Sequence, residues 1–380
     1  MFNFFYSQTA FGLDISDLSL KLIQLRKVRN EIKLHASNEM LVPAGYIVSG
    51  VIKNPKEVIA LIQKIIKTSI GNKISTSNVV VSLPETKTFI KLIEIPQVEN
   101  KKIFETVEQE ISRHIPLIKD EMYFDWQVIK KTTEKDEKRI QILVGATPKN
   151  IVDSYVDLLK RAGLTPKIFE IEACAIVRNL IKKENNEPRI ILDLGASRSS
   201  LIICNNGTIQ FSISMHFSGE KLTQQIASKL EISLEEAERA KKICGVDKEK
   251  CQAIPREILF EYLFELSEEI KTILSFYKTH FSFNGVFKEM ILCGGGSNLI
   301  GLDVYLSDQF DIKVKKEIPW IFKEQCFNHK KKTLKLLIGD FFFQPLFSKQ
   351  IKSCPFSEDK FASHATVLGL ALRGIMNAEE

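Results

Sequence analysis

The sequence predicts an α/β protein with two related lobes and a smaller insert. Segments with the two-residue alternation of strands alternate along the chain with segments of helical periodicity. The chain has 380 residues, which exceeds what one hydrophobic core usually holds. The segment GLDISDLSLKLI, residues 12–23, also resembles LDLGASRSSLII, residues 192–203, because both predict a strand, an aspartate, a polar turn and a second strand. Two related hairpins indicate two related halves.

The first elements along the chain are two strands, FGLDIS and LSLKLIQLRKV, joined by a turn. Residues 55–69 have apolar positions at helical spacing, and Pro55 stands in the first turn, where proline is tolerated. NVVVSLP then predicts a short buried strand that ends at Pro84.

From residue 85 to about 165 the pattern predicts a compact β-α-β-β insert. The strand TFIKLIEIP precedes a helix over residues 99–114, and a hairpin follows around the charged turn TTEKDEK. A further helix, KNIVDSYVDLLKRAGL, closes at Gly163.

The second half begins with a strand leading into a helix, PKIFEIEACAIVRNLI, before the second hairpin. Residues 219–280 are mostly helical in pattern, and Ser233 with Glu236 forms a capping box. EMILCGGGSNLIGLDVYLSDQF predicts a strand, a triple glycine and a helix.

Composition indicates a globular protein and excludes a mainly disordered or fibrous one, with 44% apolar and 26% charged residues. The net charge is +6, and its densest basic run is KEQCFNHKKKTLK, residues 323–335. Such a run is typical of a solvated loop, although it also suits an anionic membrane surface. No zinc-ligand spacing or helix-turn-helix accompanies it, so we expect no nucleic-acid partner.

The seven cysteines are odd in number and include no C-x-x-C pair. Several lie in apolar strands, where reduced cysteine behaves as a small hydrophobe, so we expect reduced thiols and a cytoplasmic protein. No run of 18 apolar residues predicts a membrane span, and the start of the chain lacks the features of a signal peptide.

The two similar hairpins predict a phosphate-binding cleft. Small turn residues allow backbone N–H groups to approach phosphate oxygens, and Asp14 and Asp193 would face each other and hold Mg²⁺, most readily through water. Taken singly, each turn is also compatible with an ordinary tight turn, and CGGGS with a Rossmann-type loop or a helix entry. No βαβ unit with an acidic residue ~20 positions on follows CGGGS, which disfavours the Rossmann interpretation. The ordered set of two hairpins and a late glycine loop is the specific signal.

That order resembles the actin, Hsp70 and sugar-kinase superfamily, in which two phosphate hairpins and a late adenosine loop enclose ATP between two lobes. Eight motifs give a closer match: GLDISDLSLKLIQL, VVVSLPETKTFIKLIEIP, EISRHIPLIKDEMYFDWQVI, LVGATPKNIVDSYVDLLKRAGLTPKIFEIEACAIVRNL, LDLGASRSSLIICNNGTIQFS, FSGEKLTQQIASKLEISLEEAERAKK, ILCGGGSNLIGLDVYL and ATVLGLALRG. Together they resemble the type IV pilus assembly protein PilM family, whose members are relatives of the division protein FtsA.

This resemblance implies an actin-like two-lobed ATPase fold made of duplicated ribonuclease-H-like domains, with an FtsA-type 1C (SHS2-like) insert. Residues 85–165 would form subdomain 1C. Residues 1–84, 166–188 and 349–380 would form subdomain 1A, and residues 189–348 the second lobe with subdomains 2A and 2B.

The resemblance also implies ATP and Mg²⁺ as ligands, with Asp14 and Asp193 holding the metal through water. Glu172 is the candidate to orient an attacking water or a magnesium-bound water, and otherwise a carboxylate at a helix entry. The implied nucleotide-binding set is Asp14, Ser16, Asp193, Gly195, Ala196, Ser197, Gly219, Glu238, Lys241, Gly294, Gly295, Gly296 and Ser297.

Three features depart from the family pattern. Asp17 replaces a small hydroxyl residue, and its carboxylate would repel phosphates unless it points away or reaches the metal. Ser218 stands where a second glycine is common, and residues 321–352 match poorly. Nucleotide binding is therefore expected, with slow or absent ATP turnover.

The function implied is a cytoplasmic scaffold at the inner membrane, peripheral through its partners. Its 1A/1C surface would bind the N-terminal cytoplasmic tail of PilN and help connect the inner-membrane complex to the pilus motors. A small-molecule kinase is disfavoured by the 1C-like insert, and an FtsA-type filament protein by the polar end RGIMNAEE, where an amphipathic membrane helix would be expected. A scaffold of a type II secretion system is a close variant.

Overall fold

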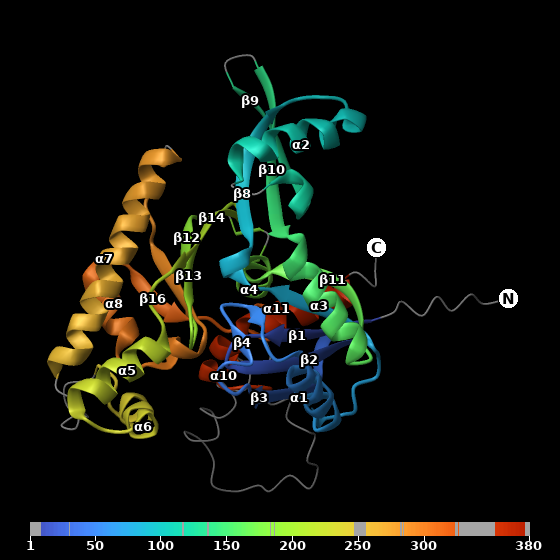
Figure 1. Ribbon diagram of the computed structural model, residues 1–380. Helices are drawn as coiled ribbons and strands as arrows, with labels where there is room; N and C mark the ends of the chain where they lie inside the picture. Colours follow the sequence, from blue (N-terminus) through green and yellow to red (C-terminus); the bar gives the residue numbers. More distant parts are fainter. Residues whose placement is uncertain are drawn as a thin grey trace, which may run out of the picture.

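A computed structural model describes residues 9–376 apart from 30, 116–117, 135–136, 183, 186, 247–255, 282, 284, 324–325 and 327–353. Two lobes lie side by side, and the insert stands above the lobe that contains β1 (Figure 1). The predicted basic run 323–335 lies almost entirely outside the described residues.

The first lobe is built on a six-stranded sheet in the order β11-β7-β1-β2-β3-β6. Strand β1 pairs antiparallel with β2 to form the first predicted hairpin, and parallel with β7 on its other side. A separate pair, β4 with β5, follows β3. The strands are β1 (Phe11–Ile15), β2 (Ser19–Val28), β3 (Glu31–Leu41), β4 (Ile47–Val48), β5 (Val51–Ile52), β6 (Ile70–Gly71), β7 (Asn78–Leu83) and β11 (Thr165–Ile171).

The second lobe repeats this arrangement, with strand order β16-β15-β12-β13-β14. Strand β12 pairs antiparallel with β13 in the second hairpin and parallel with β15 on its other side, as β1 does with β2 and β7. The prediction of two related halves is therefore confirmed. The strands are β12 (Arg189–Leu194), β13 (Ser199–Asn205), β14 (Thr208–Met215), β15 (Glu289–Cys293) and β16 (Lys313–Lys316).

Helices cover both faces of the first sheet. The apolar residues of α1 (Pro55–Lys67) and α3 (Lys149–Arg161) share one core with β1, β2 and β7. On the other face, α11 (Ala365–Met376) packs against β1 and β2. Helix α4 (Glu172–Leu180) crosses α11 and buries its remaining apolar residues against the second sheet, which joins the lobes. The short α10 (Glu358–Ser363) precedes α11.

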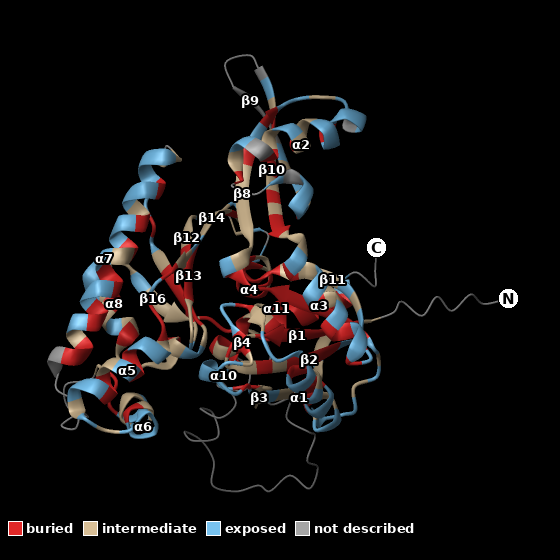
Figure 2. Cartoon of the chain, in the orientation of Figure 1, coloured by how far each residue is buried: buried red, intermediate tan, exposed pale blue. Residues whose placement is uncertain are grey.

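The helices of the second lobe pack on the outer face of its sheet. Their apolar residues form one core with β12, β13 and β15. Figure 2 shows that the buried residues gather along the central strands of both lobes, whereas much of the outer surface of α7 is exposed. These helices are α5 (Gly219–Leu230), α6 (Leu234–Cys244), α7 (Arg256–His280) and α8 (Leu302–Phe310).

The insert has the predicted β-α-β-β order and a core of its own, built around Ile95, Val107 and Ile142. Its strands extend the second sheet through a contact between β14 and β8, where Phe211 pairs with Lys91. Helix α3, by contrast, packs into the core of the first lobe. The five domain ranges stay predictions. The elements are β8 (Phe89–Pro96), α2 (Ile103–His114), β9 (Met122–Glu134) and β10 (Glu137–Pro148).

The cysteines differ from the sequence expectation. Cys326 and Cys354 form a disulfide across a sequence separation of 28 residues, with their Cα atoms 4.7 Å apart. The expectation of reduced thiols is therefore wrong for this pair and for Cys244, which is also disulfide-bonded, whereas Cys204 and Cys293 are free and buried as expected. The expectation failed because the pairing depends on both residues packing beside α11 and β2, which no local spacing reveals.

Within the part of the chain that the structure describes, no helix combines the length and apolar character needed to cross a bilayer.

Candidate functional site

The first hairpin places Asp14 at the end of β1, directly opposite Lys21 of β2. Asp14 is buried, and the hydroxyl of Ser82 on the neighbouring β7 donates a 2.9 Å hydrogen bond to Asp14 Oδ1. Ser16 Oγ lies 3.5 Å from the same oxygen. The hairpin thus presents a carboxylate held in place by its neighbours, with a cation on the adjacent strand.

The carboxylate of Asp17 binds the loop between β4 and β5. It accepts hydrogen bonds from the backbone N–H groups of Ser49 at 3.0 Å and Gly50 at 2.9 Å. The extra carboxylate that departs from the family pattern therefore fixes the loop between β4 and β5.

The second hairpin places Asp193 opposite Ser200, one residue before β12 ends. Its turn is tight, because a Cβ on Gly195 would lie 2.2 Å from the carbonyl oxygen of Arg198. Burial raises the pKa of Asp193 to about 6, and the charge of Lys21 opposes this while that of Asp14 adds to it. Charged residues of the first hairpin therefore lie close enough to Asp193 to act on its pKa.

The N-terminus of α5 supports the second turn. The N–H groups of Gly219 and Glu220 donate to the carbonyl oxygens of Gly195 at 3.1 Å and Ala196 at 2.8 Å. Ser218 caps the helix by accepting a 3.2 Å hydrogen bond from the N–H of Lys221. Ser218 therefore has a structural role, and the N–H of the predicted ligand residue Gly219 is already used inside the protein.

Glu238 and Lys241 on α6 also reach this helix N-terminus. Lys241 Nζ lies 2.6 Å from Glu238 Oε2 and donates to the carbonyl oxygen of Gly219 at 2.9 Å. A further hydrogen bond of 2.8 Å joins Lys241 to Thr223 Oγ1. The α6 pair thus lies beside the helix N-terminus that supports the second hairpin turn, and its predicted role in nucleotide binding stays a prediction.

The glycine loop lies against the second hairpin. Gly294 has φ +78°, and a Cβ there would lie 2.4 Å from the carbonyl oxygen of Leu194 and 2.5 Å from Asp193 Oδ1. Ser297 is buried, and its hydroxyl donates to the carbonyl oxygen of Gly294 at 2.7 Å. The predicted order of strand, glycines and helix is confirmed, with a 3₁₀ turn over Gly295–Asn298 before α8 begins at Leu302.

Glu172 is the first residue of α4 and is buried. Burial raises its pKa, as do the nearby carboxylates of Asp14, Glu85 and Asp193, whereas Arg198 opposes the rise. The Arg198 guanidinium lies 2.9 Å from Glu172 Oε1 through Nη2. The candidate catalytic carboxylate is thus held in an ion pair with the second hairpin.

Sequence reasoning missed two residues of this site, Lys21 and Arg198. A lysine within the apolar strand LSLKLIQL was an available signal, because it follows Asp14 in the same hairpin. Arg198 gave no comparable signal, since its partners Asp17 and Glu172 are far away in sequence.

The carboxylates of the two hairpins suit Mg²⁺ that is also bound by water and phosphate, rather than a metal bound by protein side chains alone. Across the described ranges, no three His, Cys, Asp or Glu side chains gather as metal ligands. Mg²⁺ is usually held by one or two carboxylates together with waters and substrate phosphates. Asp14 and Asp193 provide two such carboxylates on facing hairpins, so the residues present fit a magnesium–phosphate complex.

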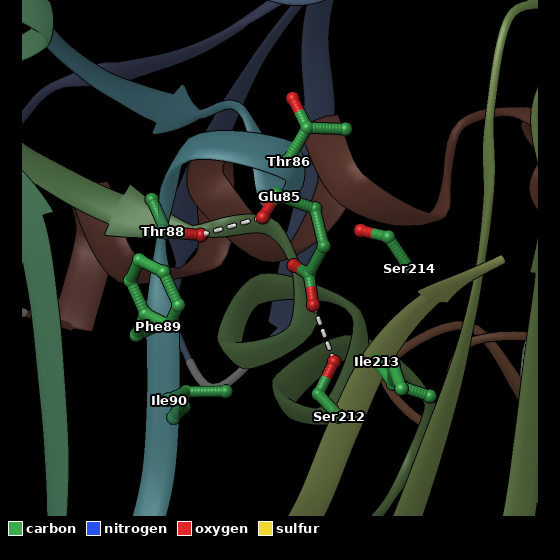
Figure 3. Close-up of a pocket in the computed structure, with 8 residues that line it drawn as sticks. All are labelled: Glu85, Thr86, Thr88, Phe89, Ile90, Ser212, Ile213 and Ser214. Carbon is green, nitrogen blue, oxygen red and sulfur yellow. Dashed lines mark hydrogen bonds between the residues drawn. The ribbon is translucent and has the colours of Figure 1, made fainter. Parts of the chain in front are cut away.

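A separate cavity of about 410 Å³ lies between β14 and the start of β8 (Figure 3). Buried Glu85 accepts a hydrogen bond from Ser212 at its wall. No residue of the predicted nucleotide site lines this cavity. Its lining residues are Glu85, Thr86, Thr88, Phe89, Ile90, Ser212, Ile213 and Ser214.

The profile of the family described as type IV pilus assembly protein PilM matches residues 12–344. The chain belongs to this PilM family. A chain of the solved PilM-PilN type IV pilus biogenesis complex is 22% identical, with a TM-score of 0.74 over 97% of this chain and 98% of that one.

Two other solved structures show the same actin-like ATPase fold. The ethanolamine utilization protein EutJ from Carboxydothermus hydrogenoformans is 13% identical, with a TM-score of 0.52 over 96% of this chain and 89% of its own. MreB 5 of Spiroplasma citri bound to AMPPNP is 14% identical, with a TM-score of 0.50 over 86% and 98% of the respective chains. This PilM family member therefore has the fold that the sequence predicted.

Proposed function

We propose that the protein is an ATP-binding, actin-like scaffold of the type IV pilus inner-membrane assembly complex. It works at the cytoplasmic face of the membrane, binds the N-terminal tail of PilN and links it to the pilus machinery. The observation that carries the nucleotide part is the convergence of three predicted segments. Lys21 and Asp14 act on Asp193 across the lobes, and Gly294 lies directly against Asp193.

Each part of this site has a role in holding a nucleoside triphosphate. The small residues of the turn around Gly195 allow its backbone to approach the phosphates closely. Lys21 on the first hairpin supplies a positive charge. When bound, Mg²⁺ would neutralise phosphate charge, with Asp14 and Asp193 as its protein-side ligands. The related fold of MreB 5, solved with AMPPNP, is consistent with this use of the cleft.

Slow or absent hydrolysis follows from the position of Glu172. A residue that activates water must present its carboxylate to that water. Here the Glu172 carboxylate is held by the Arg198 guanidinium at 2.9 Å, so it is not free to orient a water. We therefore propose that ATP acts mainly as a ligand that sets the arrangement of the lobes and so biases partner binding.

The insert offers the surface for the tail of PilN. Strand β9 ends the order of the eight-stranded sheet, so its outer edge faces no other described strand. Exposed apolar side chains lie on it and on the neighbouring α2, including Tyr123, Val128 and Phe104. An extended tail can bind by adding a strand to such an edge or by filling an apolar slot. The match to a PilM-PilN complex supports PilN as the partner.

Titration of the purified protein with a fluorescent peptide of the N-terminal tail of its cognate PilN tests this function. We expect saturable binding that differs between Mg-ATP and nucleotide-free protein, and no binding of a scrambled peptide. Equal, weak binding of both peptides in both states would contradict the proposal.

A further inference from the structure

Arg198 joins the two lobes at the point where the predicted phosphate hairpins meet. It belongs to the turn of the second hairpin, and its Nη2 lies 2.9 Å from Glu172 Oε1 at the start of α4. Its Nη1 lies 3.9 Å from Asp17 Oδ1 in the turn of the first hairpin. One side chain of the second lobe therefore contacts both the first hairpin and the candidate catalytic residue.

The guanidinium has an unused donor in this buried place. Only 14% of the Arg198 side chain is exposed. Nη1 is fully buried, and no protein atom of the described residues accepts a hydrogen bond from it. Asp17 lies too far for a hydrogen bond and already accepts two from backbone N–H groups. A buried guanidinium donor without an acceptor is unfavourable, so the arrangement favours an added anion.

The charge of Arg198 is permanent. Burial alone would lower the pKa of its guanidinium, but the surrounding groups, chiefly Glu172 and then Asp17, raise the pKa above its ordinary value. The planar guanidinium can hold two oxygens of one phosphate side by side, which a lysine cannot do. The side chain therefore has both the charge and the geometry for a phosphate group.

We propose that Arg198 recognises the terminal phosphate of a nucleoside triphosphate and makes the protein distinguish ATP from ADP. This inference rests on the proposed nucleotide binding between the hairpins. The turns face each other, and Arg198 reaches from the second turn to the first, so its guanidinium lies where the end of a phosphate chain would lie. A diphosphate in the same cleft is one phosphate shorter and does not reach it.

Phosphate binding also affects Glu172 and the joining of the lobes. The phosphate competes with Glu172 for the guanidinium, so a triphosphate loosens the Arg198–Glu172 pair while a diphosphate leaves it intact. The pair is a direct link from the second hairpin to α4, which packs between the lobes. A ligand that acts differently on this link shifts the equilibrium between lobe arrangements.

The test measures the affinities of full-length protein for Mg-ATP and Mg-ADP by titration calorimetry. The variant R198M removes the charge and keeps most of the side-chain length. We expect a loss of about tenfold to a hundredfold in ATP affinity, in line with hydrogen bonds to charged groups, with ADP affinity nearly unchanged. R198K keeps the charge but loses the planar guanidinium. Its ATP affinity should lie between those of R198M and the unchanged protein.

A second variant keeps the test decisive if R198M does not fold. E172Q removes the charge that competes for Arg198, so we expect tighter ATP binding and little change for ADP. Equal weakening of ATP and ADP in R198M, or equal affinities in all variants, would overturn the role of Arg198. If the unchanged, folded protein binds neither ATP nor ADP, the proposed nucleotide binding is overturned, and the inference with it.

Discussion

The charge of Lys21 on β2 lowers the pKa of Asp193, although the two residues belong to different lobes. Burial still leaves that pKa raised to about 6, so Lys21 offsets only part of the cost of burying the carboxylate. The same lysine lies opposite Asp14 in the first hairpin. The charge of Lys21 thus acts on the aspartates of both predicted phosphate hairpins.

Replacement of Lys21 by methionine should weaken Mg-ATP binding by about tenfold or more, because a charge-assisted contact to phosphate is lost. Titration calorimetry measures this directly. The exposed Lys56→Met on α1 is the matched control and should bind as the unchanged protein does. Equal affinities of both variants would show that Lys21 does not face the phosphates.

Replacement of Gly294 by alanine should destabilise the protein by more than the strain of a positive φ alone. A Cβ at Gly294 would lie 2.4 Å from the carbonyl oxygen of Leu194, whereas Gly163 has φ +86° and open space around it. Gly163→Ala therefore isolates the backbone strain, about 1 kcal/mol. Urea unfolding should show a larger loss for Gly294→Ala, and similar losses would contradict the close approach of loop and hairpin.

The free energy of unfolding should decrease as the pH falls below about 6.5, because of His364. Burial first, and then Lys21 and Lys360, lower the pKa of this histidine to about 3, so it is neutral in the folded state. An unfolded histidine has a pKa of about 6.5 and binds a proton below that pH, which favours unfolding. The stabilisation is therefore complete above about pH 6.5 and declines as the pH falls toward 3.

The histidine effect is measured by urea unfolding at pH 5.5 and pH 7.5. Between these values His364 should account for a loss of about 1.4 kcal/mol in the free energy of unfolding. His364→Gln should lack this part of the pH dependence, whereas the exposed His280→Gln should retain it. An unchanged pH dependence in His364→Gln would mean that His364 can be protonated in the folded protein.

The Cys326–Cys354 disulfide should stabilise the protein under oxidising conditions. Closing a loop of 28 residues corresponds to about 2–4 kcal/mol in the free energy of unfolding. Cys354→Ser should lose this amount without reductant and match the unchanged protein with reductant present. If reductant has no effect on the unchanged protein, its thiols are free in solution and the sequence expectation holds after all.

Local features of the fold could be predicted from the sequence because neighbouring residues determine them. The capping box of Ser233 and Glu236 is present, and Pro55 begins α1 as expected. The hairpin that contains Asp14 follows from strand alternation and turn composition, which are also local properties. The family resemblance then supplied the order in which these pieces assemble.

Contacts between residues far apart in the sequence could not be predicted in this way. The contact of Arg198 with Glu172 joins residues 26 positions apart in different lobes. Asp17 looked like an obstacle to phosphate because its backbone partners, Ser49 and Gly50, lie 32 and 33 positions further along. Spacing within the sequence contains no signal for such pairs without a known fold.

The most direct measurement of the central claim is titration calorimetry of the full chain with ATP, with and without Mg²⁺, alongside the variant Asp193→Asn. The exposed Asp308→Asn is the control for loss of a carboxylate. We expect saturable, magnesium-dependent binding that Asp308→Asn retains and that Asp193→Asn weakens while remaining folded. Binding that is equally tight without Mg²⁺ or in Asp193→Asn would contradict the metal assignment, and no binding to folded protein would leave a scaffold without nucleotide.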